Sequence, residues 1–252
     1  MEWGFFSLTH VITLFIGAGL IIGLYFLLKK MSEKNQRTLL FALSFSGIAA
    51  ILFNLFTWGS PLEYLPFHLC SLNAMVLPFA VYKKNELLSN LLLLWSLGAL
   101  VALVVNSAQA HFEIFSFTFL FYFFPHVLEF GIPILLFKLG YVKKRLKYIW
   151  TTVAITLVVY IIIHIINLII NNYCLKNGVL NPSGEIVQVN YMFSIIPENP
   201  LLALFYSWVP YPFWYMLPVI LIVTIYLCAI YAKELIEYFK SKKANEDAPA
   251  EV

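Results

Sequence analysis

Cys70 and His126 are the two side chains of this sequence best suited to nucleophilic chemistry. Cys70 lies in the segment Leu-Pro-Phe-His-Leu-Cys-Ser-Leu at positions 65–72, and His126 follows a proline in a second apolar segment. A thiol becomes a useful nucleophile when a base or a cation favours the thiolate. On neighbouring helices the two side chains could meet as a Cys–His dyad. Cysteine is also a common small apolar residue of protein interiors, so a purely structural role stays open.

Further polar side chains accompany this pair inside apolar segments, where polar groups are costly and often functional. Glu129 lies three residues after His126 on the same helical face, and either orients the imidazole or acts as a neutral acid in a local hydrogen-bond network. Asn73 shares a face with Cys70 and could stabilise an oxyanion. His68 lies two residues before Cys70, about 200° around a helix, which predicts that the two side chains face opposite ways.

Four more residues are candidates for supporting this chemistry or lining a cavity around it. His164 and Asn167 share one face of a later helix, and Asn190 and Tyr191 follow in a long loop. Polar groups near the membrane interface cost little. We expect ordinary interfacial roles for the remaining histidines and for a second cysteine: His10, His111 and Cys174.

The sequence patterns indicate no cofactor. The sequence contains no glycine-rich phosphate loop, no HExxH zinc motif and no CxxC pair. His68, His126 and His164 could in principle share a metal ion, but they lack the paired spacing that is typical of metal ligands. We therefore expect neither a metal nor an organic cofactor.

The composition places these residues in a membrane. Of 252 residues, 62% are hydrophobic and only 12% are charged, well below the share in soluble domains, and the mean hydropathy is +0.85. These values exclude a soluble enzyme, a disordered chain and a disulfide-framed secreted domain. Seven apolar stretches are long enough to cross a bilayer, which predicts an all-α polytopic membrane protein with seven transmembrane helices. The stretches are 10–28, 39–58, 64–82, 86–105, 114–138, 147–170 and 212–232.

Basic residues indicate the orientation of the chain. Fifteen of the sixteen lysines and arginines follow the first, third, fifth or seventh stretch, and only Lys176 lies on the other side. The positive-inside rule then puts the N-terminus outside and the C-terminus in the cytoplasm. We expect a seven-helix domain over residues 1–232, with a lid-like external loop at 171–211 that contains an Asn-Pro-Ser-Gly turn. A charged, disordered tail is expected at 233–252.

The depth of the two reactive side chains tests the idea of a dyad. Counted from the predicted outer helix ends at about 1.5 Å per residue, Cys70 lies about 9 Å deep and His126 about 18 Å. The pair therefore meets only if the fifth helix begins later than residue 114, tilts, or breaks near Pro125. The histidines all fall in the outer half of the predicted membrane domain, which predicts a site that opens outward.

Several of these segments resemble a known family. The segment at 65–72 is similar to the LPxHLCSL signature of the YwaF-like bacterial integral membrane family. Pro-His-Val at 125–127, Asn-Tyr-Met-Phe at 190–193 and the aromatic, proline-rich run at 210–215 match later blocks of that family in the same order. The family includes a more distant animal relative, transmembrane protein 164, an acyltransferase that builds polyunsaturated ether phospholipids through a cysteine acyl-enzyme.

The resemblance implies a lipid acyltransferase or transacylase in which Cys70 is the nucleophile and His126 its partner. It also implies a multi-pass protein of a bacterial plasma membrane, with a phospholipid or lysolipid substrate and no nucleic-acid partner. The alternative is a transporter or ligand-binding protein with an outward-open polar cavity, and a structural subunit is a third reading. The predominantly apolar inner half of the helices favours the enzyme.

Overall fold

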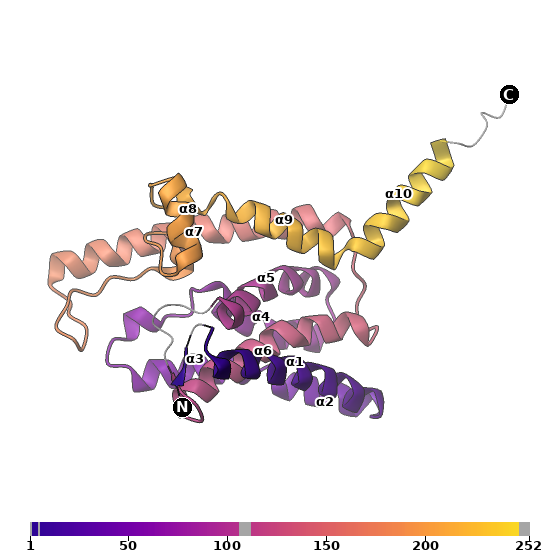
Figure 1. Cartoon of the computed structure of the whole chain (residues 1–252), viewed down its shortest axis with the longest axis horizontal. Coiled ribbons are helices and arrows are strands. Elements are labelled where there is room, and N and C mark those ends of the chain that lie inside the picture. Colours follow the sequence, from indigo (N-terminus) through magenta and orange to yellow (C-terminus); the bar gives the residue numbers. More distant parts are fainter. Residues whose placement is uncertain (1, 5, 106–111, 247–252) are drawn as a thin grey trace.

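The computed structural model describes residues 2–4, 6–105 and 112–246. Over this part the chain is almost entirely helical, which confirms the predicted all-α fold (Figure 1). The helices are α1 Leu8–Lys29, α2 Glu33–Leu43, α3 Ser46–Thr57, α4 Leu69–Lys83, α5 Glu86–Val104, α6 Phe117–Lys138, α7 Lys147–Asn177, α8 Pro200–Trp208, α9 Val219–Ile230 and α10 Ala232–Glu246. Three short 3₁₀ turns, η1 Pro61–Tyr64, η2 Tyr191–Phe193 and η3 Trp214–Met216, and two strands, β1 Glu2–Trp3 and β2 Phe112–Glu113, complete the described part.

Within the described residues, five helical segments are long and apolar enough to cross a membrane: α1, α2 with α3, α5, α6 and α7. A sixth arises if η3, α9 and α10 count as one span, although the chain bends by 74° between α9 and α10. The predicted third stretch, 64–82, is not a full span. Its helix α4 has 15 residues and is about 22 Å long, against a hydrocarbon core of about 30 Å.

Prolines explain why α4 is short. Pro61 and Pro66 precede it, and a proline both lacks the N–H that continues a helix and biases the residue before it towards extended backbone. The chain therefore forms the single turn η1, continues in extended backbone through His68, and becomes α-helical at Leu69.

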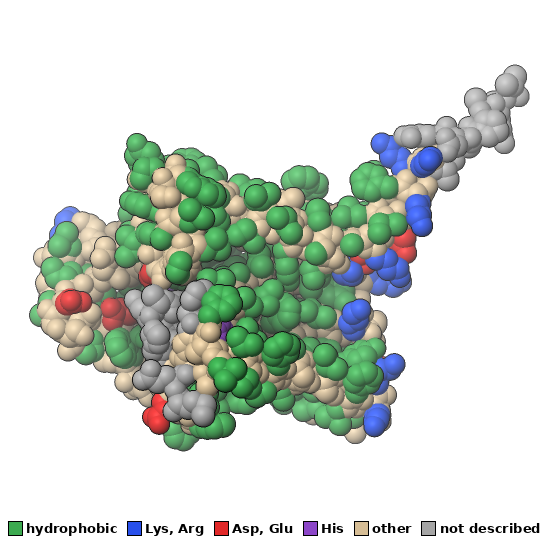
Figure 2. Space-filling model, in the orientation of Figure 1, with side chains coloured by type: hydrophobic (Ala, Val, Ile, Leu, Met, Phe, Trp, Pro, Cys, Tyr) green, Lys and Arg blue, Asp and Glu red, His purple; other side chains and the backbone are tan. Residues whose placement is uncertain are grey.

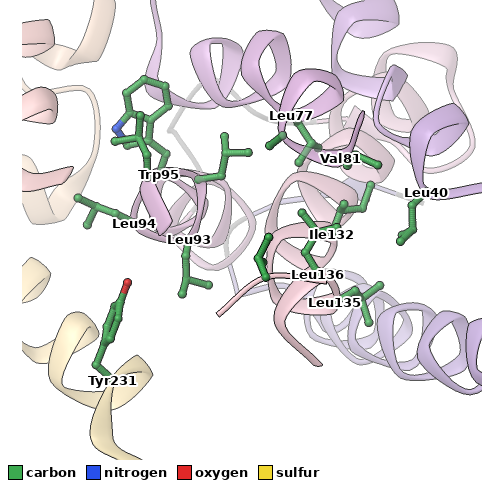
Figure 3. Close-up of a cluster of buried hydrophobic side chains, with 14 of the residues drawn as sticks. Leu40, Leu77, Val81, Leu93, Leu94, Trp95, Ile132, Leu135, Leu136 and Tyr231 are labelled. Atoms are coloured by element: carbon green, nitrogen blue, oxygen red, sulfur yellow. The ribbon is translucent and has the colours of Figure 1, made fainter. Parts of the chain in front are cut away.

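The centre of the molecule is formed by α5 packed between α4 and α6. Buried aliphatic side chains from these three helices interlock, as Figure 3 shows for Leu77 and Val81 of α4, Leu93 and Leu94 of α5, and Ile132, Leu135 and Leu136 of α6. In contrast, α1 and α7 leave most of their apolar side chains exposed, which is expected of helices that face lipid. Hydrophobic side chains accordingly cover much of the face seen in Figure 2.

The N-terminal residues are anchored in this bundle. β1 pairs with β2 in an antiparallel register, and Trp3 is fully buried beside the start of α6. Sequence patterns did not predict this pair, because two-residue strands carry no alternation that could be recognised. The strands bring Trp3 close to the residues that surround His126.

Lysine and arginine side chains gather at one end of the molecule, which we call the basic end (Figure 2). α4 and α6 both finish there, at Lys83 and Lys138. The ammonium group of Lys84 lies 4.6 Å from the centre of the Tyr141 ring, so these two helix ends lie at similar levels. Close by, Arg145 pairs with Glu86 at 2.6 Å.

The external segment begins later than predicted, because α7 continues to Asn177, beyond the expected end at residue 170. The predicted turn after it is confirmed: Gly184 has a φ of 81°, and one antiparallel bridge joins Leu180 to Ile186. The chain then returns along α7 through η2 and forms the short helix α8. The lid-like loop expected at 171–211 is therefore partly helical.

The structure also differs from the predicted disorder of the tail. α10 is helical to Glu246, and residues 247–252 lie outside the described part. Lys144 holds its first turn, since the ammonium group pairs with Glu234 at 2.9 Å and donates to the carbonyl of Ile230 at 2.7 Å. The high content of lysine and glutamate that suggested a solvated coil is also typical of exposed helices.

Candidate functional site

Cys70 is the second residue of α4, at the end away from the basic end. The first N–H groups of a helix have no acceptor within the helix, and no side chain caps them here. The polar neighbours of the Cys70 sulfur include the main-chain N–H groups of Cys70 and Ser71 and the Ser71 hydroxyl. The half-buried thiol thus lies among hydrogen-bond donors at the positive end of a helix dipole.

His126 lies in the middle of α6, and its ring is fixed by its own helix. Nδ1 lies 2.6 Å from the carbonyl oxygen of Tyr122. A carbonyl only accepts hydrogen bonds, so Nδ1 carries the proton and Nε2 keeps a lone pair that can act as a base. The Tyr122 ring lies 4.6 Å from the imidazole, and its hydroxyl donates to the carbonyl of Ala102 at 2.8 Å.

One hydrogen bond sets the register between the helices that carry the two residues. Asn73 of α4 donates from Nδ2 to the carbonyl of Glu129 on α6 at 3.1 Å. α4 and α6 run in the same direction, because α5 returns between them. Cys70 lies three residues before Asn73, and His126 lies three residues before Glu129. One step of about 4.5 Å back along each helix therefore brings the thiol and the imidazole to the same level.

A count from the basic end gives the same result. Cys70 lies 13 residues from Lys83 and His126 lies 12 residues from Lys138, about 20 Å and 18 Å along parallel helices. The sequence predicted different depths for Cys70 and His126 because the residues were counted from the outer ends of the helices, opposite the basic end. There α6 begins at Phe117, later than residue 114, and α4 begins only at Leu69.

Electrostatic contacts group the polar side chains around these two residues. Electrostatic interactions link Glu129 with both Cys70 and His126, Tyr122 with Cys70, and His68 with His126. Glu129 is 4% exposed. Among the described residues, Glu129 Oε2 and Asn73 Oδ1 have no hydrogen-bond partner. The group that orients His126 in this structure is the Tyr122 carbonyl.

His68 does not follow the helical geometry assumed from the sequence. It precedes the first turn of α4 with φ −74° and ψ 153°, so the expected angle of about 200° to Cys70 does not apply. Its Nδ1 accepts a hydrogen bond from the main-chain N–H of Met192 at 3.4 Å. The rings of Tyr191 and Phe193 each lie 5.5 Å away, so the external segment holds this imidazole.

The polar residues of α7 fasten the same segment. Asn167 donates from Nδ2 to the carbonyl of Tyr191 and to the Ser194 hydroxyl, both at 2.8 Å, and accepts the N–H of Tyr191 at 3.0 Å. His164 hydrogen-bonds to Ser194 at 2.9 Å. Asn190 donates to the carbonyl of Ile196 at 2.8 Å and to Glu198 at 2.7 Å. The structure thus brings His164 and Asn167 of α7 to the external segment, which contains Asn190 and contacts His68.

Tyr191 connects the segment to the turn that precedes α4. Its side chain is 1% exposed, and its hydroxyl donates to the carbonyl of Leu62 in η1. Its ring packs against Phe67 at 5.4 Å. The external segment therefore covers the start of α4 and approaches Cys70 through His68.

An apolar groove of about 320 Å³ lies beside the site, between α3 and α6. Its lining includes Pro125, the residue before His126, and Ser46 is its one polar lining residue. The other lining residues are Ala49, Phe117, Leu120, Phe121 and Phe124. An apolar groove next to a polar site suits a hydrocarbon chain.

Sequence reasoning missed three residues that position the site: Trp3, Tyr122 and Met192. Tyr122 carries a signal, since it lies four residues before His126 and a histidine can bond to that carbonyl. Trp3 and Met192 reach the site through long-range packing that no local pattern reports. Of the histidines expected to be ordinary, His10 is buried and donates to the carbonyl of Leu103 at 2.7 Å, and His111 lies outside the described residues.

Helices of spanning length around a half-buried thiol and several histidines define a multi-pass membrane protein with a polar site inside its helical bundle. The chain belongs to the TMEM164 family, whose family model matches residues 5–231. This match confirms the relationship to the transmembrane protein 164 family that the sequence segments implied, and it includes Cys70, His126 and the polar side chains around them. No curated protein and no solved structure matches the chain significantly.

Proposed function

We propose that the protein is a membrane-embedded lipid acyltransferase or transacylase that works through a thioester on Cys70, with His126 as its base. The observation that carries this proposal is the hydrogen bond from Asn73 to the Glu129 carbonyl, which fixes the register of α4 and α6 and aligns Cys70 with His126. The free Nε2 of His126 adds the required base.

In the first step, His126 Nε2 accepts the thiol proton while the sulfur attacks the ester carbonyl carbon of a phospholipid. The tetrahedral intermediate then collapses, and the carbon–oxygen bond to the glycerol breaks. The imidazolium of His126 returns the proton to the leaving lysolipid oxygen, so the products are an acylated Cys70 and a lysolipid.

The second step runs the same chemistry in reverse with another acceptor. His126 removes a proton from a lysolipid hydroxyl or an amine, which attacks the thioester carbonyl. The carbon–sulfur bond then breaks, and the imidazolium returns the proton to the leaving sulfur, which regenerates the thiol. With water as the acceptor, the outcome is hydrolysis to a free fatty acid. The groove between α3 and α6 supports lateral access, because its apolar lining includes Pro125, the residue before His126, and suits the acyl chain.

The proposed location is the outer leaflet of a cell membrane, with the basic end in the cytoplasm. The clustering of lysines and arginines at one end supports this orientation, and Cys70 lies towards the opposite end. A transporter would need a polar route onward from Glu129. Instead, the next turns of α4 and α6 contribute Leu77, Ile132 and Leu136, which are at most 1% exposed. This packing favours the enzyme.

Intact-mass measurement of the purified protein with a labelled phospholipid tests the proposal. We expect a hydroxylamine-labile acyl mass in the wild type, its loss in Cys70→Ala and a slower appearance in His126→Ala. Cys228→Ala is the matched control, because Cys228 is an exposed thiol on α9 and its loss should leave the adduct unchanged. An adduct that disappears only in Cys228→Ala, or no acyl transfer at all, contradicts the thioester mechanism.

A further inference from the structure

His68 is a second histidine close to the reactive pair, with the opposite hydrogen-bonding character. It directly precedes α4, and Cys70 is the second residue of that helix. His126 lies close enough for an electrostatic interaction with the His68 ring. The rings of Tyr191 and Phe193 confine the imidazole at 5.5 Å each, so it is held by packing as well as by its hydrogen bond.

The main-chain partners of the two histidines assign complementary tautomers. Met192 offers an N–H group to His68 Nδ1, and an N–H only donates, so this nitrogen holds the lone pair. The proton of the neutral ring is then on Nε2. For His126 the partner is a carbonyl, which only accepts, and the proton is on Nδ1. One ring thus presents a base at Nε2 and the other presents a donor.

We propose that His68 is a catalytic hydrogen-bond donor, whose Nε2–H stabilises the oxyanion of the tetrahedral intermediate on Cys70. This inference rests on the proposed function. When the sulfur attacks, the carbonyl π electrons move to oxygen, and the Nε2–H of His68 hydrogen-bonds to that oxygen without transferring its proton. When the intermediate collapses, the carbonyl re-forms and the proton of the thiol leaves through His126 as before.

Asn73, which the sequence offered for this role beside an exposed backbone N–H, directs one amide N–H at another acceptor. The amide of Asn73 is fully buried one turn further along α4 and donates to the Glu129 carbonyl. The uncapped N–H groups of Cys70 and Ser71 lie on the thiol side and can share the oxyanion with His68. Together they form an oxyanion site from a helix start and one side chain, and donors placed in this way act most strongly where water is excluded.

The external segment gains a function from this assignment. Met192 has a φ of 53° and Phe193 one of 54°, both in the left-handed region that residues with side chains rarely adopt. This backbone directs the Met192 N–H at His68. The lid-like segment thereby selects the donor tautomer of His68, and α7 holds that segment in place through Asn167.

Three variants of His68 test the role of the donor. His68→Gln keeps an amide N–H near the position of Nε2, whereas His68→Leu removes the donor and His68→Asn places its amide nearer the position of Nδ1. We expect acylation of Cys70 by a labelled phospholipid, followed by intact mass, to slow about 10²-fold or more in His68→Leu and His68→Asn. His68→Gln should stay within about tenfold of the wild type. The effect should fall on the maximal rate rather than on its dependence on lipid mole fraction.

The outcomes separate this inference from the proposed function. If the wild type acylates Cys70 and His68→Leu does so equally fast, or if His68→Gln is as slow as His68→Leu, the donor role of His68 is overturned while the thioester mechanism stands. If the wild type never acylates Cys70, the proposed function itself fails.

A measurement that needs no substitution at His68 tests the proposal even if the His68 variants do not fold. ¹⁵N NMR of histidine-labelled protein in detergent distinguishes protonated from unprotonated ring nitrogens. We expect His68 to be protonated at Nε2, as His10 is through its hydrogen bond to the Leu103 carbonyl, and His126 to be protonated at Nδ1. A His10→Asn variant removes the His10 signal and so assigns the remaining one. A His68 ring protonated at Nδ1 contradicts the proposal.

Discussion

At the scale of single residues, the orientation of His126 depends on a carbonyl of its own helix, and that carbonyl belongs to Tyr122. Tyr122 in turn is fixed by its hydrogen bond to Ala102 and by contact with Trp3, whose ring lies 5.6 Å away. The base of the proposed reaction is therefore held through a short series of contacts that ends in the N-terminal strand β1.

Trp3→Ala is expected to destabilise the protein and to slow acylation of Cys70. The side chain is fully buried, donates to the Thr13 hydroxyl at 2.8 Å and packs against Phe119 and Tyr122. Loss of a buried tryptophan costs about 3–5 kcal/mol. Thermal unfolding in detergent measures this cost. Trp150→Ala is the control, since Trp150 is 80% exposed on α7, and a similar fall in both variants would contradict the packing argument.

Glu198 makes stability depend on pH in the external segment. Burial raises the pKa of its carboxyl group, and the hydrogen bond from Asn190 offsets part of this shift. The folded protein thus keeps the proton at pH values where the unfolded chain has lost it. The free energy of unfolding consequently falls as pH rises through the interval between the unfolded pKa and the raised folded pKa.

Glu198→Gln should remove this part of the pH dependence and raise the melting temperature at neutral pH, because glutamine keeps an acceptor for Asn190 without a charge. Melting curves measured between acidic and neutral pH test the prediction. Glu185→Gln, at the exposed turn of the same segment, serves as the control. A melting profile that is unchanged in Glu198→Gln would count against the assignment.

At the scale of elements, α3 approaches α4 and α6 at a single glycine. A Cβ atom on Gly47 would lie 2.3 Å from Glu129 Oε1 and 2.5 Å from the Ala74 side chain. The helix is therefore close enough to bury the carboxyl group of Glu129 against its backbone. This contact supports the same region of α6 that receives the hydrogen bond from Asn73.

Gly47→Ala should lower the free energy of unfolding by about 1–3 kcal/mol, because the added methyl group must displace α3. Gly19→Ala offers a matched control on α1, where an added Cβ would meet no atom of the described residues within 4 Å. That control should be neutral or slightly stabilising, since alanine favours helix over glycine. Equal melting temperatures for the two variants would show that α3 does not pack as described.

The apolar stretches predicted most of the helices, and the two main differences have physical causes. Hydropathy averages over a window, so it merged η1, the extended residues 65–68 and α4 into one stretch, although Pro66 already signals the interruption. α10 was taken for a coil because its composition is charged. The pairing of Lys144 with Glu234 that holds its first turn joins distant parts of the chain.

At the scale of the whole molecule, charge is distributed along the long axis. The basic end contrasts with the opposite end, where acidic side chains are visible and few basic ones are (Figure 2). The positive-inside rule predicts that the turn at residues 181–184 faces outward and that α10 lies in the cytoplasm.

Single cysteines at exposed positions test this orientation. In intact cells, a membrane-impermeant maleimide should label Ser183→Cys at the external turn, and Ser241→Cys on α10 only after permeabilisation. Both positions are exposed, so the comparison reports sidedness rather than accessibility within the fold. The reverse labelling pattern would invert the proposed leaflet.

The candidate site was partly predictable because its residue types are rare in apolar segments. Cys70, His126, Glu129 and Asn73 stood out for this reason, whereas their register depended on where α4 begins and on one hydrogen bond between helices. The contribution of the external segment could not be derived. The contact between Met192 and His68 joins residues far apart in the sequence, and its backbone geometry follows from packing.

The shortness of α4 has a consequence for the surrounding bilayer. Cys70 lies about 20 Å above the basic end, and so about 10 Å inside a hydrocarbon layer of about 30 Å. The ester groups of an unperturbed leaflet lie higher than this sulfur, so the lipid must sink or the leaflet must thin around the start of α4. Hydrophobic mismatch of this kind costs fractions of a kcal/mol per ångström. Acylation should therefore be faster in bilayers of short-chain lipids than in thick ones, which makes membrane thickness a natural regulator of the reaction.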